Sequence, residues 1–234
     1  MAQILDQLQG KLIVSCQALE NEPLYGAEIM AKMAVAAVEG GAAGIRANTP
    51  QDIQAIKKSV RVPVIGLYKR DYENSDIYIT PTIREVEAIA EAGADIIAVD
   101  LTERERPDGR TANQLLAEIK RKFPKIPIMA DISTAKEAVN VSIGGADLIS
   151  TTLVGYTSYT SHIHSFQPSI LSEIIEKVDS PIVAEGRIET PQQAALCLEL
   201  GAFSVVVGSA ITRPQVIARR FSIEMSKGRG AKEE

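Results

Sequence analysis

The chain has 234 residues, of which 45% are hydrophobic and none is tryptophan, and its formal net charge is −5. This length suits a single domain, and the scarcity of aromatic side chains predicts an aliphatic core. A negative charge without an offsetting basic face argues against a general nucleic-acid-binding protein, because such proteins neutralise phosphates with lysine and arginine. No apolar run approaches the ~20 residues of a membrane-spanning helix, so we expect no membrane partner.

The two cysteines, Cys16 and Cys197, lie far apart in apolar contexts. This pattern predicts buried, reduced thiols and a cytoplasmic protein, because structural disulfides belong mainly to oxidising compartments. No stretch at the N-terminus has the charged-then-apolar form of a signal peptide.

Short apolar runs alternate along the chain with amphipathic stretches of helical period. The apolar runs, which we predict to be strands, open at Lys11, Gly44, Val62, Asp95, Ile126, Asp147, Ser180 and Phe203. The predicted helices are Ala27–Glu39, Pro50–Ser59, Thr82–Ala92, Thr111–Lys122, Thr134–Gly144, Ser169–Lys177, Thr190–Leu200 and Pro214–Met225. Near-continuous apolar strands between amphipathic helices indicate a parallel sheet.

A Gly-Ala pair ends every second predicted helix and precedes a strand, with the glycines at Gly41, Gly93, Gly145 and Gly201. Successive glycines are 52, 52 and 56 residues apart. Eight strand–helix units with this double period predict an α/β fold of the (β/α)8 TIM-barrel type, in which the helix from Pro214 closes the ring. A doubly wound open sheet is the alternative. We expect residues 1–225 to form this single domain and residues 226–234 to be a disordered tail.

Polar residues follow the four odd-numbered strands, at Gln17, Lys69, Asp131 and Glu185. Side chains of one layer in a barrel come from alternate strands, so these four are predicted to share a polar layer at the barrel mouth. Lys69 would then face Glu185 across the mouth, and Gln17 would face Asp131, with Arg46 between Gln17 and Lys69. A structural salt-bridge network is the alternative interpretation.

The last two strands each lead into a glycine and an arginine. Gly186 and Arg187 follow one strand, and Gly208, Ser209 and Arg213 follow the other. The loops after the last two strands of such barrels commonly bind phosphate, and arginine adds charge to backbone N–H donors there. These residues therefore predict a site for a phosphorylated small molecule.

A lysine and a carboxylate on opposite faces of one pocket suit proton transfer with inversion at a carbon next to a carbonyl. Lys69 would act as the base, which requires a lowered pKa, and Glu185 or a substrate hydroxyl would act as the acid. Gln17, Arg46 and Asp131 would hold substrate hydroxyls and the developing oxyanion. A Schiff-base aldolase or lyase and a non-catalytic sugar-phosphate sensor are the alternatives.

Other motifs are weaker. Thr152 and Tyr156 follow the sixth strand and either reach a sugar or simply pack in the loop. His162 and His164 are predicted to be exposed loop residues rather than metal ligands, and the charged stretch Arg104–Gly109 to be a solvated lid. No metal-ligand cluster, dinucleotide fingerprint or Walker loop occurs, so we expect no metal and no cofactor.

The strand ends resemble those of the N-acylmannosamine-6-phosphate 2-epimerases. The motifs are Ile13–Leu19, Gly44–Ala47, Ile65–Arg70, Tyr78–Thr82, Met129–Ser133, Ser150–Thr157, Ala184–Ile188 and Gly208–Pro214. The resemblance implies a cofactor-free epimerase that interconverts N-acetylmannosamine 6-phosphate and N-acetylglucosamine 6-phosphate during bacterial sialic acid breakdown.

By the same resemblance, the roles divide over the barrel mouth. The catalytic residues are Lys69 and Glu185. The residues that contact the sugar are Gln17, Arg46 and Asp131, and those around the phosphate are Gly186, Arg187, Gly208 and Arg213. From their positions in the sequence we add Thr152 and Tyr156 to the predicted sugar site and Ser209 to the predicted phosphate site. A homodimer is the expected assembly. The chain departs from the family in having Gln167-Pro168 where an acidic residue is usual, which bears on loop shape and oligomer contacts.

Overall fold

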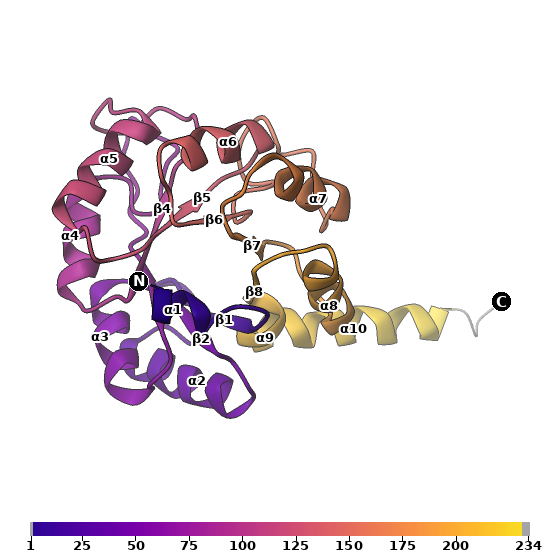
Figure 1. The fold of residues 1–234 in the computed structure, drawn as a ribbon. Helices are drawn as coiled ribbons and strands as arrows, with labels where there is room; N and C mark the ends of the chain where they lie inside the picture. Colours follow the sequence, from indigo (N-terminus) through magenta and orange to yellow (C-terminus); the bar gives the residue numbers. More distant parts are fainter. Residues whose placement is uncertain (1, 231–234) are drawn as a thin grey trace.

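A computed structural model describes residues 2–230 and shows eight parallel strands closed into a barrel in the order β1 to β8 (Figure 1). The strands are β1 Leu12–Cys16, β2 Gly44–Asn48, β3 Val64–Leu67, β4 Ile96–Asp100, β5 Ile128–Asp131, β6 Leu148–Ser150, β7 Ile182–Glu185 and β8 Ser204–Val207. Pairing of β1 with β8, such as Leu12 with Val205, closes the ring of strands. The predicted TIM barrel is confirmed.

Helices follow the strands and cover the barrel from outside. They are α2 Ala27–Glu39, α3 Pro50–Ser59, α4 Ile83–Glu91, α5 Ala112–Lys122, α6 Ala135–Ile143, α7 Pro168–Lys177 and α8 Pro191–Glu199. Four of them begin with a capping box, in which a threonine side chain and a Glu or Gln three residues later satisfy each other's backbone N–H groups. The threonines are Thr82, Thr111, Thr134 and Thr190.

The repeated glycines lie in the turns that lead from a helix to the next strand. Gly41, Gly93, Gly145 and Gly201 have φ angles of 100°, 91°, 87° and 99°. A side chain is strained at such angles, so glycine ends the helix there at least cost. The repeat in the sequence is therefore a repeat of one turn.

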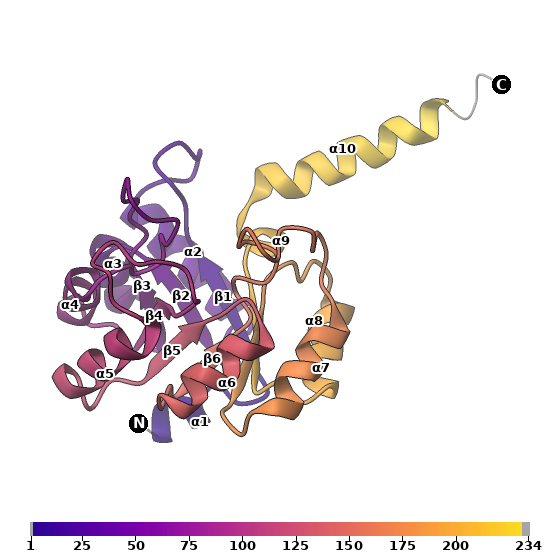
Figure 2. The ribbon, with the colours of Figure 1, turned by 90° about the horizontal axis from the view of Figure 1, so that it is seen from above.

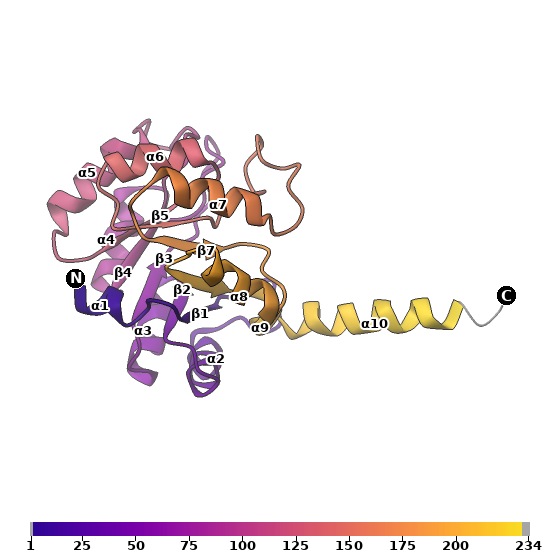
Figure 3. The ribbon, with the colours of Figure 1, turned by 45° about the vertical axis from the view of Figure 1, so that its right-hand side comes forward.

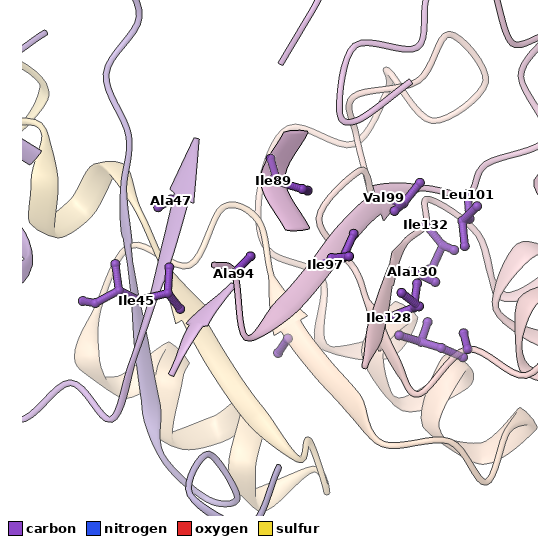
Figure 4. Packing of buried hydrophobic residues seen from close by; sticks show 14 of the residues in the cluster. Ile45, Ala47, Ile89, Ala94, Ile97, Val99, Leu101, Ile128, Ala130 and Ile132 are labelled. Atoms are coloured by element: carbon purple, nitrogen blue, oxygen red, sulfur yellow. The ribbon is translucent and has the colours of Figure 1, made fainter. Parts of the chain in front are cut away.

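Two apolar layers stabilise the fold. The larger lies between strands and helices, and Figure 4 shows its part around Ile97 and Val99 of β4 and Ile128 and Ala130 of β5. The second fills the barrel interior. At its base is Leu8, fully buried beyond the N-terminal helix α1 (Ala2–Asp6). Figure 2 shows α1 at the end of the barrel opposite α9 (Ser209–Thr212).

The prediction that the helix from Pro214 closes the ring of helices is wrong. The helix α10 (Pro214–Gly230) projects away from the barrel, as Figures 1, 2 and 3 show. Residues from Ala218 to Lys227 are all exposed. Helical periodicity predicts an apolar face, but it does not specify the surface that this face meets. The short α9 turns the chain outward after β8.

Residues 226–230 of the expected C-terminal tail belong to helix α10. Helix α10 continues through Ser226 and Lys227, whose ammonium pairs with Glu224 at 3.0 Å. Residues 231–234 of the expected disordered tail lie outside the described residues. None of the helices within residues 2–230 has the length and apolar character needed to cross a membrane.

Both cysteines are free and buried, as predicted. Burial raises the pKa of Cys16 to about 12 and that of Cys197 to about 11. Their thiols therefore stay protonated and unreactive near neutral pH.

Candidate active site

A cavity of about 1470 Å³ opens at the carboxyl ends of the strands. Every residue that the sequence places in the site lines this cavity except Asp131, which is fully buried beneath it. Residues at or after the ends of β1, β2, β3, β6, β7 and β8 thus converge on one pocket.

Arg46 lies at the centre of the polar layer rather than at its edge. Its guanidinium reaches from β2 across the barrel and forms ion pairs with Asp131 of β5 and Glu185 of β7. Its Nη1 also donates to Thr152 Oγ1 at 3.0 Å. The expected position of Arg46 between Gln17 and Lys69 missed this reach, because the length of an arginine side chain carries its charge well away from its own strand.

Thr152 joins the two carboxylates that Arg46 pairs with. Its hydroxyl lies 2.9 Å from Asp131 Oδ1 and 3.0 Å from Glu185 Oε2. Ser150 Oγ is 2.8 Å from the same hydroxyl and 3.3 Å from Glu185 Oε2. The network fixes the Glu185 carboxylate from several sides.

Burial and charge oppose each other in this network. Burial alone would lower the pKa of Arg46, but Asp131 and Glu185 outweigh it and raise that pKa. Burial raises the pKa of Asp131 to about 6, although Arg46 pulls it down. Removing one member would leave another charge buried without compensation.

Gln17 does not join this network. Its amide Nε2 donates to Ser15 Oγ at 2.9 Å, and its Oε1 is buried without a hydrogen-bond partner among the described residues. Gln17 therefore lines the cavity and carries an acceptor that no described residue uses.

Lys69 is held by its backbone. Its N–H donates to Asn48 Oδ1 at 2.8 Å, and it bridges to Ile79 of the loop that follows β3. The neighbouring Tyr68 N–H donates to Thr80 Oγ1 at 3.1 Å. These contacts set where the side chain begins while leaving it free of ion pairs with carboxylates in residues 2–230.

The surroundings of Lys69 favour its neutral form. Burial, first, and then the positive charges of Arg46 and Arg213 lower its pKa to about 8, against the opposing influence of Glu185 and Glu22. A substantial neutral fraction near neutral pH is what a general base requires.

Arg213 follows α9 and points into the cavity beside the loop after β8. Its Nη1 donates to Ser209 Oγ at 3.1 Å. Gly208, before Ser209, lies beside β1, since a Cβ there would be in van der Waals contact with Ser15 Cβ at 3.5 Å. The last-strand glycine and arginine are thus brought together, as the predicted phosphate site requires.

Arg187 contacts the loop after β6. Its Nη2 donates to the Gly155 carbonyl at 3.0 Å and its Nη1 to the His164 carbonyl at 3.2 Å. The guanidinium also lies over the Tyr156 ring, 4.4 Å from its centroid. Arg187 therefore ties the β6 loop to the β7 loop, and its predicted contact with phosphate stays a prediction.

The charged stretch after β4 is not the solvated lid that we expected. Arg106 is only 1% exposed, and Arg104 pairs with the fully buried Asp100. A buried carboxylate at a strand end needs a counter-charge, which explains why the arginines fold inward. His162 and His164 are exposed, as predicted. No group of three or more potential metal ligands gathers within the described chain.

The prediction missed three residues that shape the site. Asn48 is the last residue of β2, so the strand-end rule applied to the other polar residues would have found it. Ser15 points inward from β1 within an apolar run. Glu22 lies in a charged loop and carries no local signal of its contact with Arg213.

Comparison with known proteins identifies a family and relatives that match most of the chain. A family model described as "NanE: Putative N-acetylmannosamine-6-phosphate epimerase" matches residues 30–227. A protein of Caldanaerobacter subterraneus with the name "Putative N-acetylmannosamine-6-phosphate 2-epimerase" is 54% identical over 218 residues, 93% of this chain and 92% of its own. One of Listeria welshimeri with the same name is 48% identical over 226 residues, 96% of each chain.

Two solved structures superpose on most of the chain. The N-acetylmannosamine-6-phosphate 2-epimerase from Clostridium perfringens superposes with a TM-score of 0.90 at 46% identity, over 93% of this chain and 94% of its own. Thiamine phosphate pyrophosphorylase from Pyrococcus furiosus superposes with a TM-score of 0.61 at 19% identity, over 89% of each chain, and so shares the fold alone.

Proposed function

Because the chain belongs to the N-acetylmannosamine-6-phosphate epimerase family, we propose that it interconverts N-acetylmannosamine 6-phosphate and N-acetylglucosamine 6-phosphate. The observation that carries the proposal is Lys69, a lysine with a pKa of about 8 that lines the same cavity as Glu185 and Arg213. The reaction belongs to the breakdown of sialic acids and amino sugars.

The proposed step moves one proton at C2 of the sugar, next to the C1 carbonyl of its open-chain form. Neutral Lys69 removes the C2 proton and becomes an ammonium, while negative charge develops on the carbonyl oxygen. Return of a proton to the opposite face inverts C2. Because hydrogen moves as a proton, the step needs no redox cofactor.

The proton that returns to C2 comes from a substrate hydroxyl or from the Glu185 carboxyl, which must carry a proton at that stage. Proton exchange with solvent then restores neutral Lys69 and the group that gave the proton. Glu185 is 12% exposed and held by Arg46 and Thr152, so its carboxylate has a fixed direction toward the cavity. Gln17, Arg46, Asp131, Thr152 and Tyr156 complete the proposed sugar site. Arg46 lies where it can compensate negative charge on the substrate.

The phosphate group is assigned to the loops after β7 and β8. Arg213 supplies positive charge. Gly186, which has a φ of 101°, and Gly208 have no side chain that would occupy the space proposed for the phosphate. Ser209 adds a hydroxyl. Arg187 belongs to this group as the residue that holds the β6 loop beside it.

Proton NMR in heavy water with N-acetylmannosamine 6-phosphate tests the proposal. We expect deuterium at C2 of both sugars with no cleavage product. Cleavage, together with a borohydride-trapped adduct on Lys69, would instead identify a Schiff-base aldolase. Binding without deuterium uptake would identify a sugar-phosphate sensor.

We also propose a homodimer in the cytoplasm, with neither nucleic acid nor membrane as a partner. Phe221, Ile223 and Met225 of the projecting α10 are 67%, 51% and 65% exposed, and a second copy would remove them from water. Sedimentation of the native chain and of Phe221→Asp tests this: a dimer that the substitution weakens is expected, and an unchanged monomer would contradict it.

A further inference from the structure

A carboxylate from the opposite end of the sequence holds the predicted phosphate-binding arginine. Glu22 lies in the loop between β1 and α2, whereas Arg213 follows α9 after the last strand. Arg213 Nε lies 2.8 Å from Glu22 Oε1, and Arg213 Nη2 lies 2.9 Å from Glu22 Oε2. The contact is a two-pronged one along one edge of the guanidinium, the geometry that fixes an arginine most firmly.

The hydrogen bonds of Arg213 leave a defined pair of donors unused. A guanidinium has five N–H groups. The Nε group forms an ion-pair contact with Glu22, Nη2 donates one hydrogen bond to Glu22, and Nη1 donates one to Ser209 Oγ. The remaining two are one each on Nη1 and Nη2, a fork that suits two oxygens of a phosphate.

Glu22 is itself held in place before any ligand binds. Its Oε2 accepts the backbone N–H of Leu19 at 2.9 Å, within its own loop. Its Oε1 accepts Gln215 Nε2 at 3.3 Å, from the first turn of α10. The carboxylate is 17% exposed, so it is neither loose in solvent nor deeply buried.

We infer that Glu22 is a positioning residue that orients Arg213 for the substrate's phosphate group and thereby sets the preference for phosphorylated over unphosphorylated sugars. This inference rests on the proposed function. It places part of the determinant of phosphate affinity in the β1–α2 loop, where Glu22 acts on the phosphate through Arg213.

Two effects of the Glu22 charge oppose each other. The carboxylate repels an incoming phosphate, but both side chains of the pair are partly exposed, so solvent screens that repulsion. Loss of orientation is not screened, because a freed arginine must be ordered again when the phosphate binds. Orientation therefore dominates, and removing the carboxylate weakens binding.

The test is Glu22→Gln, which keeps the size of the side chain but offers one acceptor oxygen in place of two. Calorimetric Kd values are measured for N-acetylglucosamine 6-phosphate and for N-acetylglucosamine, and KM and kcat for epimerisation. We expect Kd and KM for the phosphorylated sugar to rise about tenfold, a change of ~1.4 kcal/mol. The Kd of the unphosphorylated sugar and kcat should stay within about twofold.

Three controls give the result its meaning. Glu28→Gln removes the same charge from α2, outside the cavity lining and from an exposed position, and should change none of these values. In an Arg213→Ala background, Glu22→Gln should have no further effect, since coupled residues are not additive. Melting temperatures of all variants report whether they fold.

A second readout tests whether the charge of Glu22 acts on the site, which a role in loop packing alone would not require. Arg46, Arg213, Glu185 and Glu22 are the charges that act on Lys69, and Glu22 raises its pKa. Glu22→Gln should therefore shift the rise of kcat/KM with pH toward lower pH, and Glu28→Gln should not. Packing of the loop alone would leave this profile in place.

Several outcomes would overturn the inference: an unchanged or smaller Kd for the phosphorylated sugar, equal losses on both sugars, or full additivity with Arg213→Ala. The calorimetric arm does not depend on turnover. If the native chain failed to epimerise, the proposed function would fall, while the Kd values would still decide the role of Glu22.

Discussion

Arg46 and Lys69 both extend from strand ends into the barrel mouth, yet their surroundings differ in kind. Arg46 is 1% exposed and its charge is matched by Asp131 and Glu185, with Thr152 between them. Lys69 is anchored through its backbone, and its nearest charged influences include two arginines that disfavour its ammonium form. The carboxylates beside Arg46 keep its guanidinium charged. Lys69 has no ion-pair partner of this kind within the described residues, so its amine can change its charge.

The difference separates the tasks of the mouth. A cation locked among carboxylates keeps the same charge throughout a reaction and can orient a substrate. A cation whose pKa lies near the working pH can give and take a proton. The predictions below either remove a group of one of these two kinds or measure the difference between Arg46 and Lys69.

The largest effect is expected for Lys69→Ala. Loss of the base should lower kcat by ~10²–10⁴-fold and remove deuterium uptake at C2, because Lys69 is the group proposed to accept that proton. Binding of N-acetylglucosamine 6-phosphate should survive through Arg213. Full activity in this variant, measured by NMR in heavy water, would refute the mechanism.

Glu185→Gln tests whether the carboxylate network around Arg46 also takes part in proton transfer. If Glu185 is the opposing acid, the variant should exchange the C2 proton from the Lys69 face and yet fail to invert, by ~10²-fold or more. If a substrate hydroxyl does this work, exchange and inversion should slow together. The ratio of deuterium uptake to epimer formation separates the two cases.

Arg213→Ala is expected to act on binding. Loss of a charge-assisted hydrogen bond costs about 1.5–3 kcal/mol, so KM for the phosphorylated sugar should rise by roughly one to two powers of ten. The unphosphorylated sugar lacks the partner and should be unaffected. Equal losses on both sugars would contradict the assignment of the phosphate site.

The pH dependence measures the contrast directly. Lys69 must be neutral to act, so kcat/KM should rise with pH through about 8 and level off above it. Below that point, activity should fall about tenfold per pH unit. In Arg213→Ala one of the charges that lower this pKa is gone, and the rise should move to higher pH. A pH-independent rate from pH 6 to 9 would exclude Lys69 as the base.

The smallest effect is expected for metal removal. The proposed proton transfer draws on Lys69 and the carboxylate network alone, so incubation with EDTA should leave kcat/KM unchanged within about twofold. Activity lost with EDTA and restored by one added metal would show that a metal ion takes part in the reaction beside Lys69 and the carboxylate network.

The fold was largely predictable because its signals are local. Glycine ends a helix at Gly41 and Gly93 for a conformational reason that acts within a few residues, and apolar strands can be recognised without their partners. The direction of α10 could not be predicted, because it depends on what its apolar face meets. The β4 loop was also misread, since the burial of Arg106 depends on Asp100 and on the surrounding chain.

The site was predictable as a set of residues and less so as a set of contacts. Barrel topology brings Lys69, Asp131 and Glu185 to one mouth whatever their side chains do. The path of Arg46 across the barrel and the hold of Glu22 on Arg213 depend on side-chain length and on loops far apart in the sequence. Their functional roles rest on the experiments above.

The buried Leu8 at the base of the barrel has a consequence for the opposite end. It closes an apolar column that continues upward through Ile65 and Met129 to the charged layer. Burial is the leading cause of the altered proton affinities of both Lys69 and Asp131, and burial means a low local dielectric constant. By closing the base of this apolar interior, Leu8 helps to exclude water from the region beneath the charged layer, without touching any reacting group.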